Sequence, residues 1–139
     1  MPLVTRFFIR TSFVCLALAL FAALLLALRS SVAMPDVLAA LSPVYFHLFM
    51  VGWVTQLIFG VAYWMFPKYS REQPRGSALL AWLCFAGLNG GLLLRVIAEP
   101  LNATQSSPLW DWSLLLSALL QWFAGLLFVV NTWSRVKER

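Results

Sequence analysis

The sequence predicts an all-α integral membrane protein, a bundle of four membrane-spanning helices. Hydrophobic residues make up 62% of the 139 residues and charged residues only 11%, which is too apolar for a water-soluble domain of this size. The apolar residues are also gathered into four segments, each long enough to cross the hydrocarbon of a bilayer as a helix. The length fits a single membrane domain over residues 1–139.

Aromatic residues support the boundaries of these four segments. Trp is enriched at the two membrane–water interfaces, so Trp110 and Trp112 are expected at the outer interface and Trp64 and Trp133 at the inner one. The expected spans cover about residues 7–28, 43–66, 77–98 and 109–133.

The second span has clear start and stop signals. Ser42 and Pro43 offer an N-cap and a proline in the first helical turn, and Pro67 ends the helix. Before this span, Pro35 can begin one or two helical turns. These turns would lay residues 37–41 on the membrane surface as a lid above the second span.

Three amides lie near the middle of the spans. An unpaired amide is costly in hydrocarbon, so Gln56, Asn89 and Gln121 are expected to hydrogen-bond with one another between helices. Stabilisation of the bundle is the expected role, in preference to a polar conduction path. Small residues allow membrane helices to approach closely. The glycines expected to do so are Gly52, Gly60, Gly87, Gly90 and Gly91.

The net charge of +5 is distributed unevenly along the chain. Lys and Arg cluster before the first span, between the second and third, and after the fourth, which are the segments that the positive-inside rule assigns to the cytoplasm. We therefore expect both termini in the cytoplasm and a multi-pass protein of a bacterial-type inner (plasma) membrane. Because the basic residues flank the spans, nucleic acid is not expected as a partner.

The N-terminus also resembles a secretory signal, with Arg6 and Arg10 before an apolar run. The run is long for the apolar region of a signal peptide, so cleavage is not expected. Cys15 and Cys84 fall within the first and third spans. They are expected to be small buried hydrophobic residues and not to form a disulfide.

Candidate chemistry centres on His47, the only histidine in the chain, near the outer end of the second span. One interpretation is an interfacial histidine bonded to a loop carbonyl. The other is a metal ligand, because neutral imidazole binds heme iron, copper or zinc and ionisable residues in membrane helices often mark functional sites. No second histidine is present, so a metal would need ligands from another copy of the chain or another subunit.

Arg95 and Glu99 lie near the outer end of the third span. They are four residues apart, so they share one face of a helix. In one interpretation they neutralise each other as an interfacial pair. In the other, Arg95 faces inward and meets an anionic group, such as a heme propionate, near His47.

The order of His47, Met50, Gly60, Tyr63 and Pro67 resembles the second membrane helix of heme–copper oxidase subunit I. In that family a histidine near the outer start of the helix is an axial ligand of the low-spin heme, and the helix runs inward to a proline. The family's subunit has three arcs of four helices, and this chain has the length of one arc. The resemblance implies a heme-binding membrane protein that transfers electrons or binds a gas, with heme b as cofactor and His47 as its metal ligand.

This resemblance also implies an oligomer, because one nitrogen cannot complete a low-spin heme site. A homotrimer would imitate the three arcs and is favoured, whereas a dimer would place two His47 side chains on opposite faces of one heme. Three histidines also suit copper, which is the alternative cofactor.

Two further functions stay open. A cofactor-free structural or assembly subunit of a larger respiratory complex would explain the scarcity of polar residues. A small transporter is the least favoured function, because Glu99 and Asp111 are both expected near the outer surface and not at mid-membrane. No catalytic residue is assigned, and enzymatic activity is left open.

Overall fold

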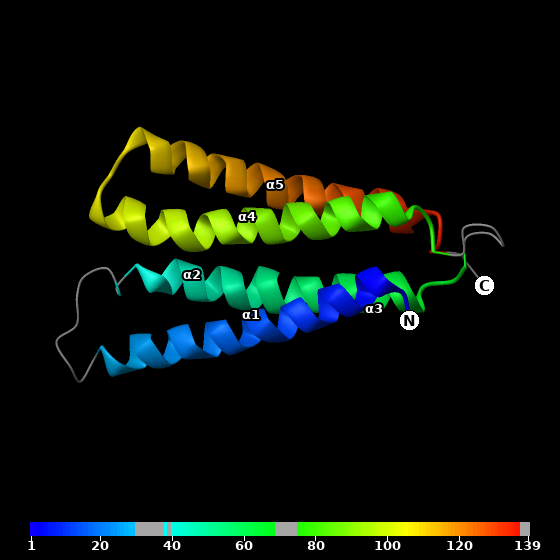
Figure 1. Cartoon of the computed structure of the whole chain (residues 1–139), viewed down its shortest axis with the longest axis horizontal. Coiled ribbons are helices and arrows are strands. Elements are labelled where there is room, and N and C mark those ends of the chain that lie inside the picture. The colour runs from blue at the N-terminus through cyan, green and yellow to red at the C-terminus, as the bar shows by residue number, and fades with distance from the viewer. Residues whose placement is uncertain (30–37, 39, 69–74, 137–139) are drawn as a thin grey trace.

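The computed structural model describes residues 1–29, 38, 40–68 and 75–136. Within these ranges every long element is a helix (Figure 1). The π-helical segment η2 continues α2 and is continued by α3, so the three form one long helix. The elements are α1 (Leu3–Leu28), α2 (Leu41–His47), η2 (Leu48–Thr55), α3 (Gln56–Met65), α4 (Ala78–Thr104) and α5 (Pro108–Trp133).

Four helices in the described part of the chain are long and apolar enough to cross a membrane: α1, the continuous α2–η2–α3, α4 and α5. The all-α class and the four predicted spans are confirmed in these terms. The helix of the third span continues past residue 98, where the span was predicted to end, and runs through Pro100 to Thr104. The Thr104 hydroxyl donates to the carbonyls of Pro100 and Leu101 and so satisfies acceptors in this last turn.

The N-cap predicted for the second span is also wrong. The helix begins at Leu41, directly after Ala40, and no side chain caps it. Ser42 and Pro43 lie inside the first turn, where the missing N–H of proline has no intrahelical bond to lose. At the other end the helix stops before Pro67, as predicted. Of the lid predicted over residues 37–41, residues 37 and 39 lie outside the residues that the structure describes, and Leu41 is the first residue of α2.

The spans form two helical hairpins that lie side by side (Figure 1). In the first hairpin α1 packs against α2, η2 and α3, and in the second α4 packs against α5. The beginning of α1 and the end of α5 lie at the same end of the bundle (Figure 1). We call the opposite end, where α2 and α5 begin, the far end.

Small residues set the closest approaches within both hairpins. A Cβ atom placed on Gly52 would lie 2.8 Å from Cβ of Cys15, and one placed on Gly91 would lie 2.8 Å from the Ser117 carbonyl oxygen. Glycine alone allows such proximity without displacement of a neighbour. A Cβ atom placed on Gly90 would meet no atom of another helix within 4 Å, so the predicted close contact is wrong there. It is confirmed at Gly52, Gly60, Gly87 and Gly91.

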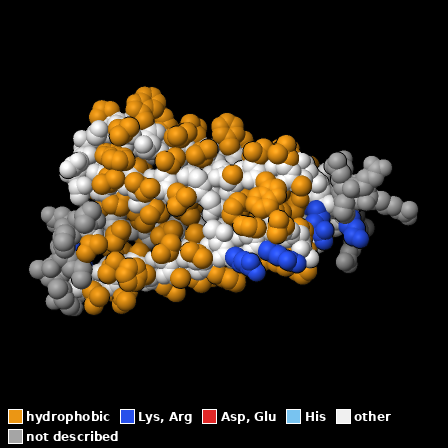
Figure 2. Space-filling view, viewed as in Figure 1, with side chains coloured by type: hydrophobic (Ala, Val, Ile, Leu, Met, Phe, Trp, Pro, Cys, Tyr) orange, Lys and Arg blue, Asp and Glu red, His pale blue; other side chains and the backbone are white. Residues whose placement is uncertain are grey.

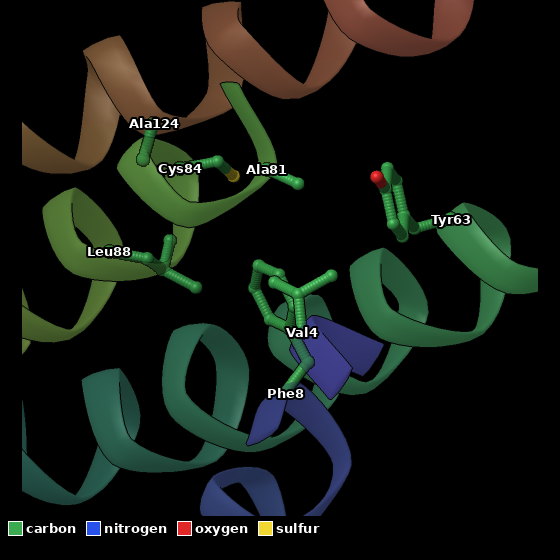
Figure 3. Close-up of a cluster of buried hydrophobic side chains, with 7 residues drawn as sticks. All are labelled: Val4, Phe8, Tyr63, Ala81, Cys84, Leu88 and Ala124. Carbon is green, nitrogen blue, oxygen red and sulfur yellow. The ribbon is translucent and has the colours of Figure 1, made fainter. Parts of the chain in front are cut away.

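A cluster of buried side chains joins the two hairpins (Figure 3). Beside it, the ring of Phe59 on α3 stacks on the ring of Phe128 on α5, with centroids 3.9 Å apart. Cys84 belongs to this cluster and Cys15 to a second cluster towards the far end, and both are buried free thiols as predicted. The first cluster comprises Val4, Phe8, Tyr63, Ala81, Cys84, Leu88 and Ala124.

Arg135, just after α5, is fully buried at the end near the termini. Its guanidinium donates hydrogen bonds to the carbonyl oxygens of Tyr63, Phe66, Pro67 and Arg75. Burial lowers the pKa of Arg135 from its usual value. The carbonyl groups at the end of α3 offset the lost hydration, because the C-terminus of a helix attracts cations.

The exterior of the bundle is apolar. Hydrophobic side chains lie along the visible face of all the helices, and most of the Lys and Arg side chains in this view lie towards the end with the termini (Figure 2). Large side chains such as Phe21, Leu79, Trp112 and Val130 are more than half exposed. Helices that are apolar on their outer as well as their inner faces are typical of a lipid environment.

Candidate functional site: a polar network around His47

His47 is the last residue of α2, and the π-helical segment begins at the next residue. Its Nδ1 lies 2.8 Å from the carbonyl oxygen of Pro43, one turn earlier on the same helix. The His47 side chain is 22% exposed, so part of the ring reaches the surface of the chain.

This hydrogen bond favours the proton on one of the two ring nitrogens of His47. A carbonyl oxygen can only accept, so Nδ1 of the neutral imidazole must be the donor and Nε2 must have the free lone pair. Nε2 has no hydrogen-bond partner among the described residues. The arrangement leaves one unprotonated nitrogen available to a group outside the chain.

From His47 the polar contacts continue to α4 and α5. Glu99 Oε1 lies 3.9 Å from His47 Nδ1 and accepts a hydrogen bond from Arg95 Nη1 over 2.9 Å. Arg95 Nε donates to the Ser117 hydroxyl over 3.3 Å. The ion pair expected from the four-residue spacing is therefore present on α4, where it lies near His47 of α2 and bonds to Ser117 of α5.

Ser117 anchors the network in the contact between α4 and α5. Its side chain is fully buried, and its hydroxyl donates to the Gly91 carbonyl over 2.6 Å. The same hydroxyl accepts from Gln121 Nε2 over 3.1 Å. These bonds fix the position of the Ser117 hydroxyl, which accepts the hydrogen bond from Arg95. We call His47, Glu99, Arg95, Ser117 and Gln121 the His47 network.

The charges of Arg95 and Glu99 balance, but one oxygen is left over. The two side chains are 18% and 11% exposed, so the pair is largely screened from the surroundings. Glu99 Oε2 is buried and has no hydrogen-bond partner among the described residues. Such a group is costly in an apolar environment and is worth a functional explanation.

The predicted pairing of the mid-membrane amides with one another is wrong. Gln56 is fully buried against α1, where Nε2 donates to the Phe8 carbonyl over 3.4 Å. Asn89 donates to a carbonyl one turn earlier on its own helix, and Gln121 donates to Ser117. Gln56 thus bonds across the contact of α3 with α1, whereas Asn89 and Gln121 bond to acceptors one turn earlier on their own helices.

The donor set for a metal within one chain is small. Among the described residues no group of three or more His, Cys, Asp or Glu side chains could hold a metal ion. His47 Nε2 is available as one ligand, which fits a single axial position of a heme iron. Arg95 Nη2 also has no partner among the described residues, so it offers a cationic donor within the His47 network.

The π-helical segment was not predicted. Such segments are rare and often occur at functional sites, and this one begins directly after His47. The Thr55 hydroxyl donates to the Met50 carbonyl, five residues earlier, over 2.9 Å. In the sequence, Thr55 is the only residue that could have indicated this segment. A threonine in an apolar helix occurs in α-helices too, so it does not predict a π-helix.

Comparisons of the chain with protein-family models, with curated proteins and with solved structures found no match.

Proposed function

We propose that this chain is a heme-binding integral membrane protein that transfers electrons or binds a gas, with His47 as an axial ligand of heme b. The hydrogen bond from His47 Nδ1 to the Pro43 carbonyl is the observation that supports this most directly. Ligating histidines use one nitrogen for the metal and commonly donate the other N–H to a backbone carbonyl or carboxylate. The resemblance of the second span to the ligand-bearing helix of heme–copper oxidase subunit I supports the same role.

Arg95 is the second residue proposed for heme binding. Its Nη1 and Nε are fixed by Glu99 and Ser117, and Nη2 is left to donate a charge-assisted hydrogen bond to a heme propionate. A bound heme would supply one-electron transfer or a site for a gas at the iron. The chain would supply the ligand nitrogen, its orientation and the apolar surroundings.

A low-spin heme at the proposed site would require more than one chain, because His47 provides one nitrogen only. A homotrimer is the favoured arrangement, and a dimer with two His47 ligands on one heme is the other arrangement. A larger respiratory complex could supply the second ligand in place of a further copy.

Membrane orientation forms part of the same proposal. Arg6 and Arg10 lie near the start of α1, and further basic residues lie between α3 and α4 and after α5. The positive-inside rule then favours a cytoplasmic location for both termini, in a bacterial-type inner membrane. His47 would lie near the outer surface.

The proposal is tested by purification of the protein from membranes, followed by an absorption spectrum and metal analysis. We expect a Soret band and iron, both lost in His47→Ala, with weaker binding in Arg95→Ala. Asp111→Asn is the matched control, because Asp111 also lies at the far end but bonds to Asn102 and not to the His47 network.

Copper in the absence of heme would instead favour a three-histidine site in a trimer, which is the alternative cofactor assignment. Protein that stays colourless after heme reconstitution and holds no copper would contradict the proposal. It would favour a cofactor-free structural subunit.

A further inference from the structure

We infer that Glu99 is a positioning residue for His47: its carboxylate holds the imidazole in the Nδ1–H form and makes Nε2 a stronger electron donor. This inference concerns the proposed heme site. One of its two tests rests on the proposed function, because it uses the heme-loaded protein, and the other test uses the protein without heme.

The position of Glu99 is fixed from both sides. Its Oε1 accepts from Arg95 Nη1 over 2.9 Å and lies 3.9 Å from His47 Nδ1, on a different helix. Arg95 is itself bonded to the buried Ser117 hydroxyl. The carboxylate is therefore held beside one ring nitrogen of His47 by contacts that do not depend on a cofactor.

A hydrogen-bond acceptor and a nearby carboxylate then act on the same N–H group of His47. The Pro43 carbonyl, at 2.8 Å, accepts the hydrogen bond and sets the ring direction. The Glu99 carboxylate, at 3.9 Å, adds a negative charge on the same side of the ring. A negative charge there favours the proton on Nδ1 and raises the basicity of Nε2.

The burial of Glu99 makes this charge effective. The side chain is only 11% exposed, and a charge acts more strongly in a low-dielectric environment than in water. Its second oxygen, Oε2, is also buried without a partner among the described residues, so the carboxylate lies away from the surroundings of the chain.

The first test uses the protein without heme. Because His47 is the only histidine, labelling with ¹⁵N-imidazole histidine gives NMR signals from this one ring. At a fixed pH at which the ring is neutral, we expect the Nδ1–H form to predominate in the wild type. The ratio of Nδ1–H to Nε2–H forms should fall severalfold in Glu99→Gln and should not change in Asp111→Asn. An unchanged ratio in Glu99→Gln would overturn the inference.

The second test uses the heme-loaded protein and two substitutions of opposite sign. Glu99→Gln removes a negative charge and should favour the reduced heme by about tenfold in the reduction equilibrium, or about 59 mV for one electron. Arg95→Gln removes a positive charge and should shift the potential in the opposite direction. Shifts of the same sign in both variants, or no shift in Glu99→Gln with heme retained, would overturn the inference.

The two tests separate this inference from the proposed function. Absence of heme from the wild type would contradict the proposed function, and the NMR ratio would still decide the role of Glu99. If Glu99→Gln does not fold, Glu99→Asp takes its place. The shorter side chain moves the carboxylate away from Nδ1, so the NMR ratio should fall below that of the wild type and of Asp111→Asn. A ratio equal to theirs would overturn the inference.

Discussion

Arg135 Nη2 donates a hydrogen bond to the carbonyl oxygen of Tyr63 over 3.0 Å, which joins the residue after α5 to the last turns of α3. At the far end, Glu99 approaches His47 and joins α4 to α2. Polar contacts thus connect the two hairpins near both ends, while apolar side chains fill the space between them.

Replacement of Arg135 should destabilise the protein strongly. Arg135→Gln would leave several buried carbonyls without their donor, and we expect a loss of about 2–4 kcal/mol in unfolding free energy. Thermal unfolding in detergent measures this. Arg10→Gln is the matched control, since Arg10 is exposed, and it should change stability little. Equal effects of the two substitutions would show that the Arg135 contacts do not stabilise the bundle.

Gly91 and Gly90 offer a matched pair of neighbouring substitutions. In Gly91→Ala the new Cβ would lie 2.8 Å from the Ser117 carbonyl oxygen and 2.9 Å from Cγ of Gln121, so α4 and α5 must separate. We expect a loss of about 1–3 kcal/mol, as for other overpacked contacts. Gly90→Ala meets no atom within 4 Å and should be neutral or slightly stabilising, because alanine favours the helix. Unfolding curves in which both variants resemble the wild type would argue against the close contact.

Gln56→Leu should alter stability by less than about 1 kcal/mol, because the amide makes one long hydrogen bond and leaves Oε1 buried and without a partner among the described residues. The free energy that this hydrogen bond contributes is largely offset by the cost of burying the amide. Heme content should not change, since Gln56 is not part of the His47 network. Loss of heme at unchanged stability would show a functional role for this amide.

Membrane orientation can be tested by cysteine labelling in a variant without Cys15 and Cys84. A cysteine at Ala103, which is exposed at the end of α4, should react with an impermeant thiol reagent added outside the cell. A cysteine at position 72, between α3 and α4, should react only after the membrane is permeabilised. The reverse pattern would place the termini outside the cell.

The four spans could be predicted from the sequence because hydrophobic length alone determines which segments can cross a bilayer. The Arg95–Glu99 pair could also be predicted, since its spacing lies within one helix. Contacts between helices could not. Gln56, Asn89 and Gln121 are all expected near mid-membrane from their positions in the spans, but their neighbours depend on how each helix is rotated.

The burial of Arg135 is another contact between helices that the sequence could not predict. In the sequence it is one of several basic residues after the fourth span, and its charge suggests a solvated position. Its burial depends on carbonyl groups that have no partner within α3, because that helix ends before Pro67. These groups belong to the first hairpin, whereas Arg135 follows the second. The bond of His47 to Pro43 is local, yet the approach of Glu99 requires that α2 and α4 lie side by side.

The π-helical segment also changes the angular relation between the two halves of the second span. Each residue of an α-helix advances by about 100°, and a wider turn advances by less. Side chains before Leu48 are therefore rotated, relative to those after Thr55, away from where a continuous α-helix would put them. Gly52 and Gly60 can both face α1 while His47 points towards Glu99. A helical wheel drawn across the whole span would misassign the face on which His47 lies.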